Sequence, residues 1–214
     1  MNTPSHLILT AAAAELVPPR RIVRSAALWG AIAPDLPLIL LSAGGYVYFH
    51  HVLGRPVGAT MRHMYTDLFF HDPAWIALHN LLHAPLLLLG GLLGLWWSKP
   101  DREAFWKSWP VWFLLSCLLH TLIDIPTHHD DGPLLFFPLD WQTRFSSPVS
   151  YWDSKHFGTR FMAIEGALDI LLLGFLAVRW LLRWLSPASH QTTTDGPDLL
   201  AEETTLAAED APDG

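Results

Sequence analysis

Charge and cysteine are scarce in this sequence. Charged residues make up 15% of the 214 positions, against roughly 25% in an ordinary soluble domain. Cys117 is the one cysteine, which excludes an internal disulfide. The Lys and Arg residues form no basic face, and this argues against nucleic acid as a partner. Apolar residues are abundant instead: 51% of the chain is hydrophobic, and it holds 11 tryptophans, a residue typical of bilayer interfaces.

Lys and Arg are absent from residues 187–214. This segment is rich in Thr, Ala and Pro, contains no aromatic residue, and holds seven acidic residues: Asp195, Asp198, Glu202, Glu203, Glu209, Asp210 and Asp213. The rest of the chain is neutral, with 13 acidic and 13 basic residues. Such a segment cannot bury enough apolar surface to offset the entropy of ordering. We therefore expect residues 187–214 to form a disordered acidic tail.

Four apolar segments are long enough to cross a bilayer, which takes about 20 mainly apolar residues. They cover residues 25–49, 73–98, 108–126 and 161–185. In the first segment Asp35 lies between Pro34 and Pro37, so we expect that helix to be interrupted. Residues 4–17 predict a helix too short to cross alone. The sequence thus predicts an all-α, polytopic membrane helix bundle of about four spans over residues 1–186.

Eight of the 13 basic residues fall on one side of this four-span topology: Arg20, Arg21, Arg24, Lys99, Arg102, Lys107, Arg179 and Arg183. The loops on the other side carry the remaining five: Arg55, Arg62, Arg144, Lys155 and Arg160. The excess of Lys and Arg in cytoplasmic loops predicts that this side is cytoplasmic and that both termini lie there. The opposite loops are residues 50–72 and 127–160. Residues 7–17 precede the first arginines, the reverse of signal-peptide order, so we expect no cleaved leader.

Histidine and aspartate recur within the predicted spans. An ionisable group at membrane depth costs roughly 2.5 kcal/mol or more, so it is normally paired, faces a cavity or binds a metal. His79 and His83 are four residues apart, as are His120 and Asp124, so each pair shares one helix face. The second and third spans are antiparallel. Both pairs therefore lie at the same, extracytoplasmic, level of the membrane.

Further donors reach the same level. Residues 4–17 and 21–33 are expected to form a helical hairpin with arms of nearly equal length, which places Asp35 at the same membrane depth as His6. His128 follows directly after the third span. Imidazole and carboxylate ligands without thiolate suit zinc first, and also manganese, iron or nickel. The candidate metal ligands are His6, Asp35, His79, His83, His120, Asp124 and His128. Asp130 and Asp131 are candidates to orient a ligand histidine or to act as general base.

Other roles remain open for these residues. A single histidine in an apolar helix often forms a hydrogen bond with a neighbouring helix. Asp35 could cap the helix that follows it, and His6 could be an ordinary interfacial residue. Glu165 and Asp169 share a face of the fourth span and could pair with a buried Arg or His, or bind metal. The whole cluster could also bind metal without catalysis, or lock the packing of the helices.

Several motifs are similar to those of one protein family. They are Thr3-Pro4-Ser5-His6-Leu7, Gly30-Ala-Ile-Ala-Pro34-Asp35-Leu36 and His120-x-x-x-Asp124-x-x-Thr127. The chain resembles the predicted membrane-bound metal-dependent hydrolases of bacteria over most of residues 1–170. Where that family has His-Arg-Gly-x-x-His, this chain has His79-Asn80-Leu81-Leu82-His83, without the arginine. The resemblance implies a multi-pass protein of a bacterial inner membrane that hydrolyses a small-molecule or lipid substrate. Phosphoester or lipid-like substrates are favoured because the predicted site faces the outer leaflet region.

Overall fold

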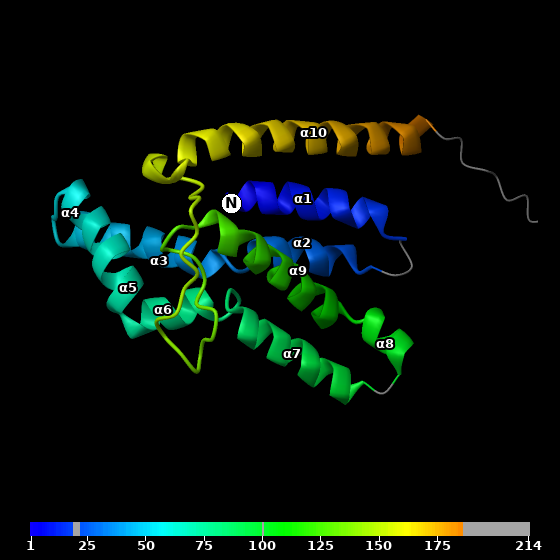
Figure 1. The fold of residues 1–214 in the computed structure, drawn as a ribbon, viewed down its shortest axis with the longest axis horizontal. Helices are drawn as coiled ribbons and strands as arrows, with labels where there is room; N and C mark the ends of the chain where they lie inside the picture. The colour runs from blue at the N-terminus through cyan, green and yellow to red at the C-terminus, as the bar shows by residue number, and fades with distance from the viewer. Residues whose placement is uncertain (19–21, 100, 186–214) are drawn as a thin grey trace, which may run out of the picture. The chain divides into compact units, whose positions relative to one another are not determined.

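A computed structural model describes residues 1–18, 22–99 and 101–185 (Figure 1). Within these ranges all regular structure is helical, and β pairing is limited to an isolated bridge between Leu134 and Arg144. The predicted all-α class is therefore confirmed. The predicted acidic tail lies outside the described residues, so the boundary at residues 186 and 187 stays a prediction. Residues 1–180 form one compact unit.

Helix α2 (Arg24–Ile32) packs closely against α9 (Trp109–Asp124), with α1 (Thr3–Leu16) and α7 (Pro85–Ser98) as neighbours (Figure 1). The contact face of α2 consists of small residues, and a Cβ atom on Gly30 would lie 2.3 Å from the Phe113 carbonyl oxygen. Small residues let membrane helices approach closely and form interhelical hydrogen bonds. One such bond runs from Ser116 Oγ to the Ala27 carbonyl over 2.6 Å.

Two of the predicted spans are bent helix pairs. Helix α2 ends at Ile32 and α3 (Leu36–Tyr46) continues at an angle of 42°, which confirms the interruption predicted at Asp35. The segment predicted as one span over 73–98 is also broken, into α6 (Pro73–Asn80) and α7, with a bend of 48°. The reason is Pro85, because a residue before proline avoids helical dihedrals, and Ala84 is extended with ψ at 119°.

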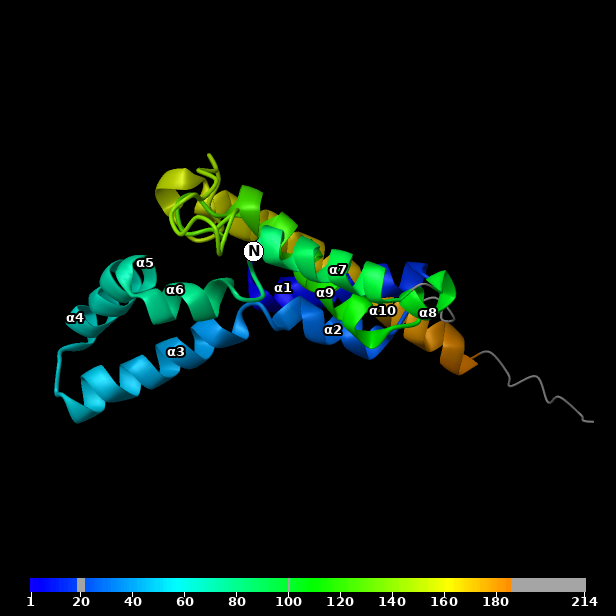
Figure 2. The same ribbon diagram turned by 90° about the horizontal axis from the view of Figure 1, so that it is seen from below.

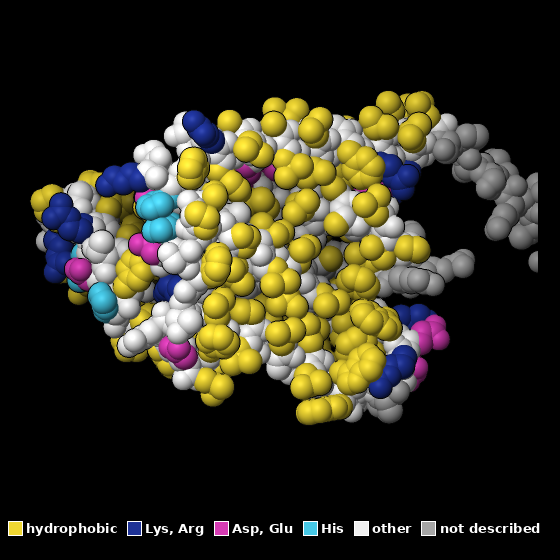
Figure 3. Space-filling model, viewed as in Figure 1, with side chains coloured by type: hydrophobic (Ala, Val, Ile, Leu, Met, Phe, Trp, Pro, Cys, Tyr) yellow, Lys and Arg dark blue, Asp and Glu magenta, His cyan; other side chains and the backbone are white. Residues whose placement is uncertain are grey.

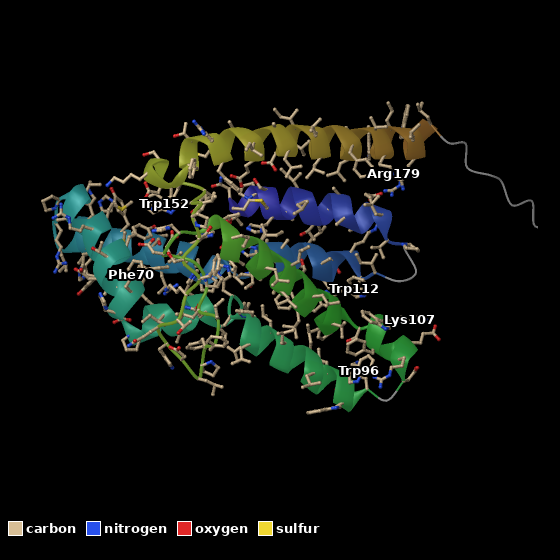
Figure 4. The ribbon with its side chains drawn as sticks, viewed as in Figure 1. Phe70, Trp96, Lys107, Trp112, Trp152 and Arg179 are labelled. Carbon is tan, nitrogen blue, oxygen red and sulfur yellow. The ribbon has the colours of Figure 1, made fainter. Side chains whose placement is uncertain are left out.

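Two helical segments are long and apolar enough to span a membrane by themselves: Trp109–Thr127 and α10 (Gly158–Leu185). The two bent pairs bring the number to four if each is one span. Hydrophobic side chains spread across the face that α7, α9 and α10 present in Figure 3. In Figure 4, Trp96, Trp112 and Lys107 lie near one end of these helices, and Phe70 and Trp152 lie toward the other. Such a distribution is typical of a bilayer-embedded bundle.

The segment between α9 and α10 folds over the ends of α6 and α9. Its Leu134 N–H donates to Asn80 Oδ1 over 2.8 Å, and its Tyr151 N–H donates to the Thr127 carbonyl over 2.8 Å. Leu134 and Phe137 pack with Ile76 in a small apolar core. This long connection is therefore a packed cover over that end of the helices.

The region predicted as a loop at 50–72 is largely helical. It contains the end of η1 (Val47–Val52), then α4 (Val57–Arg62), η2 (His63–Leu68) and α5 (Phe69–His71). Met64 is 1% exposed and lies against Gly45, which explains why this segment folds back on α3. Figure 2 shows α3 and α6 side by side, with α4 and α5 near their far end.

The predicted hairpin of α1 and α2 is present, and it locates the N-terminus. The Met1 amine lies 2.8 Å from Asp124 Oδ1. At the other end of α1, Glu15 lies 3.1 Å from Arg24 and 3.6 Å from Arg179. Met1 therefore lies at the end of α1 opposite to these arginines. The side of the membrane on which each terminus lies stays a prediction.

Candidate metal centre

Three segments bring four ligand groups together. Asp35 comes from the α2–α3 break, His83 from the α6–α7 break, and His120 and Asp124 from α9. One donor atom of each lies within 4.8 Å of the others. The two helix breaks thus place side chains at the level where α9 ends.

Asp124 is the centre of the group. Its Oδ2 lies 3.0 Å from His83 Nε2 and 3.0 Å from His120 Nε2. Its Oδ1 lies 2.9 Å from His6 Nε2 and 2.8 Å from the Met1 amine. The residue is 1% exposed, so both of its oxygens interact with protein groups away from water.

The hydrogen bond of His120 to a backbone carbonyl shows which ring nitrogen carries a proton. Nδ1 lies 2.8 Å from the Ala31 carbonyl, which can only accept, so Nδ1 must donate. Nε2 then faces two carboxylates, at 3.0 Å from Asp124 Oδ2 and 3.4 Å from Asp35 Oδ1. Neither contact has hydrogen-bond geometry among the described residues. A lone pair opposite two carboxylates calls for a cation between them, or for a second proton on the ring.

Three of the distances between donors fit a shared ion. Two donors at about 2.1 Å from one ion lie about 3.0 Å apart at a right angle and about 3.4 Å apart at the tetrahedral angle. The three contacts just described measure 3.0, 3.0 and 3.4 Å. Metal-ligating histidines also usually donate their second ring N–H to a carbonyl or carboxylate, as His120 does to Ala31. Spacing alone does not separate an ion from hydrogen bonds, because His83 Nε2 also has hydrogen-bond geometry toward Asp124.

Buried imidazole nitrogens without partners concentrate here. Within the described ranges they are His6 Nδ1, His79 Nδ1, His83 Nδ1 and His120 Nε2. An unsatisfied buried polar atom costs about 1–3 kcal/mol. Of the four, His120 Nε2 is the nitrogen that faces the carboxylates of Asp35 and Asp124, since His6 and His83 approach Asp124 with Nε2.

Three further candidates adjoin the four without belonging to them. The His6 ring stacks on His120, with centroids 3.6 Å apart. The His79 ring meets His83 edge-on at 4.9 Å, so of the predicted pair only His83 joins the four. His128 donates from Nδ1 to the Asp124 carbonyl over 3.0 Å, and burial lowers the pKa of its imidazole.

Asp130 and Asp131 lie in the cover and outside the group of four. Asp130 is exposed, and Asp131 accepts a hydrogen bond from Trp152 Nε1 over 2.7 Å. Both carboxylates also act on Arg144: burial lowers the pKa of its guanidinium to about 10, and their charges oppose that shift. The catalytic role predicted for them stays a prediction.

The alternative roles of three carboxylates can now be assigned. Asp35 precedes α3 but its side chain makes no capping bond in the described structure; it accepts from Thr3 Oγ1 over 2.5 Å. Glu165 accepts from the backbone and side chain of Asn2, over 2.7 and 2.8 Å. Asp169 accepts from Ser5 Oγ over 2.7 Å. Both α10 carboxylates therefore bind the start of α1, and neither is among the four donor residues of the cluster.

Fold and site together define a protein with two to four membrane-length apolar helices and a buried His/Asp cluster that could hold a metal ion. In comparisons with known proteins, no family model, no curated protein and no solved structure matches the chain.

Proposed function

We propose that this protein is an integral-membrane metal-dependent hydrolase, like the bacterial family that its motifs resemble. The observation that carries the proposal is the His120 ring, whose Nδ1 donates to Ala31 while its Nε2 faces the carboxylates of Asp35 and Asp124. A histidine oriented in this way is ready to bind a cation. Zinc is the preferred ion, with manganese, iron and nickel as alternatives.

The chemistry follows from the donor set. A zinc ion held here would act as a Lewis acid and lower the pKa of a bound water to about 7. His128 is better placed than Asp130 or Asp131 to accept a proton from that water. Its Nδ1 lies 3.7 Å from Asp124 Oδ1 and is engaged by the Asp124 carbonyl, which leaves Nε2 as the acceptor.

The membrane setting favours a phosphoester or lipid-like substrate. Hydrolysis of a phosphoester adds the oxygen of water to phosphorus, breaks the phosphorus–oxygen bond of the leaving group and transfers a proton to that leaving oxygen. Asp35 is the group through which a substrate would approach, because its side chain is 19% exposed whereas those of His120 and Asp124 are 0% and 2% exposed.

Metal analysis of the detergent-purified protein tests the proposal. We expect about one tightly bound ion per chain, and its loss in the double variant His120→Ala, Asp124→Ala. The matched control is His63→Ala, Asp67→Ala, which removes an exposed His/Asp pair with the same spacing, 2.9 Å apart. Equal metal content in the two double variants would remove the basis of the proposal.

A second candidate function is structural. The Asp124 carboxylate is within 3.0 Å of Met1, His6, His83 and His120, and so links α1, the α6–α7 break and α9. A polar network of this kind could lock helix packing without a metal. In that case His120→Ala would lower the melting temperature, and chelation would leave it unchanged.

A further inference from the structure

A long apolar groove runs along α3 and η1. Its volume is about 710 Å³, within the range of roughly 300–1,000 Å³ typical of ligand pockets, and none of its described lining residues is charged. One wall repeats every four residues, with Leu36, Leu40, Gly44 and Tyr48. These residues share one helix face and extend over about 18 Å at 1.5 Å per residue. The other wall comes largely from α6.

One end of the groove is lined by residues next to two of the metal-centre donors in the chain. Ala33 and Leu36 line it and flank Asp35, while Leu82 lines it and precedes His83. Asp35 is also the most exposed of the four donors, at 19% of its side chain, against 4% for His83. The groove lining therefore includes the chain neighbours of two donors, and none of the four donors is itself a lining residue.

We propose that this groove binds the hydrocarbon chain of a bilayer lipid whose phosphate group lies at the cluster. The inference rests on the proposed hydrolase function and specifies its substrate as a membrane phospholipid. The lining belongs mainly to the two bent helix pairs that qualify as membrane spans, so lipid chains are the apolar molecules that the groove meets. An apolar groove beside a cluster of carboxylates and imidazoles matches a lipid, which has an apolar chain at one end and a polar headgroup at the other.

Gly44 provides a way to fill the groove without disturbing the helix. No described atom lies within 4 Å of a Cβ placed on Gly44, whereas a Cβ on the adjacent Gly45 would meet Met64 Sδ at 2.8 Å. Leucine at position 44 therefore enters open space in the groove and improves helix propensity. Gly174 on α10 is the matched control, since a Cβ there also meets no described atom within 4 Å and it is not among the groove residues.

The test uses phosphatidic acid that carries a diazirine near the end of one chain. The zinc-loaded protein is placed in phosphatidylcholine nanodiscs with this probe, photolysed and mapped by mass spectrometry. We expect crosslinks to concentrate on residues 36–49. Gly44→Leu should lower their yield about tenfold, equivalent to the loss of roughly two buried methylene groups, and Gly174→Leu should leave it unchanged.

The outcomes separate the inference from the proposed function. Crosslinks spread evenly over α3 and α10, absent from α3, or unaffected by Gly44→Leu would overturn the lipid groove while metal content stays normal. Both glycine variants should retain the metal of the unmodified protein. If the protein binds no metal but is still crosslinked in the groove, the proposed hydrolase function is contradicted and the lipid-binding groove is supported.

Discussion

The close contact of α2 and α9 makes Gly30→Ala the most informative single substitution for the architecture of the site. Alanine at this position places a Cβ 2.3 Å from the Phe113 carbonyl oxygen and 2.7 Å from Ser116 Cβ. The first of these atoms is backbone in the middle of α9 and cannot rotate away. Because ordinary contact requires roughly 3.5 Å, the two helices must separate by about 1 Å.

This separation affects both the stability of the protein and its affinity for metal. Overpacking costs about 1–3 kcal/mol, while the better helix propensity of alanine returns about 1 kcal/mol, so a net destabilisation is expected. The neighbouring Ala31 carbonyl also moves away from His120 Nδ1, from 2.8 Å to beyond hydrogen-bond range. Loss of such a supporting bond typically weakens metal binding about 10- to 100-fold.

Thermal unfolding in detergent and metal titration measure the two effects. Gly30→Ala should melt at a lower temperature and bind metal more weakly than the original chain. Gly174→Ala, where the new methyl group meets no described atom within 4 Å, should be neutral or slightly stabilising. If Gly30→Ala matched this control in both assays, the proposed link between helix contact and metal binding would be refuted.

Three other predictions address the surroundings of the site. Asn80→Ala should lower the free energy of unfolding by about 1–3 kcal/mol, because it leaves the buried Leu134 N–H without its acceptor; denaturant titration against the exposed Gln142→Ala measures this. Glu165→Ala should release the start of α1 and speed proteolysis near Asn2, and unchanged cleavage would contradict its anchoring role. Removal of the metal should lower the melting temperature, since an ion at 100 times its dissociation constant stabilises by about 2.7 kcal/mol; an identical melting curve would favour the structural network.

Much of the fold could be predicted because apolar length and proline position are local properties. The break at Asp35 followed from Pro34 and Pro37, and the approximate ends of α9 and α10 followed from apolar runs. The second break was missed although Pro85 marked it, because the uninterrupted apolar composition of residues 73–98 outweighed one proline. The helices in residues 57–71 were missed because this stretch was predicted only as the loop between the first two apolar segments.

The site could be predicted only in part. His120 and Asp124 share a face of one continuous helix, so their spacing in the sequence alone predicted that they lie together in the site. His79 and His83 do not behave as such a pair, because α6 ends at Asn80 and the following turn directs His83 alone into the group. The contacts of Asn2 and Thr3 depend on how α1 docks against α10 and α3, which no local pattern encodes.

Zinc-edge X-ray absorption on the metal-loaded protein tests the central claim most directly. The account predicts nitrogen and oxygen donors alone at about 2.0–2.2 Å, with outer-shell scattering from the imidazoles of His83 and His120. A sulfur donor at about 2.3 Å would contradict it, because the one thiol, Cys117, is not among the four donors. Failure of the protein to retain any ion after loading would contradict it as well.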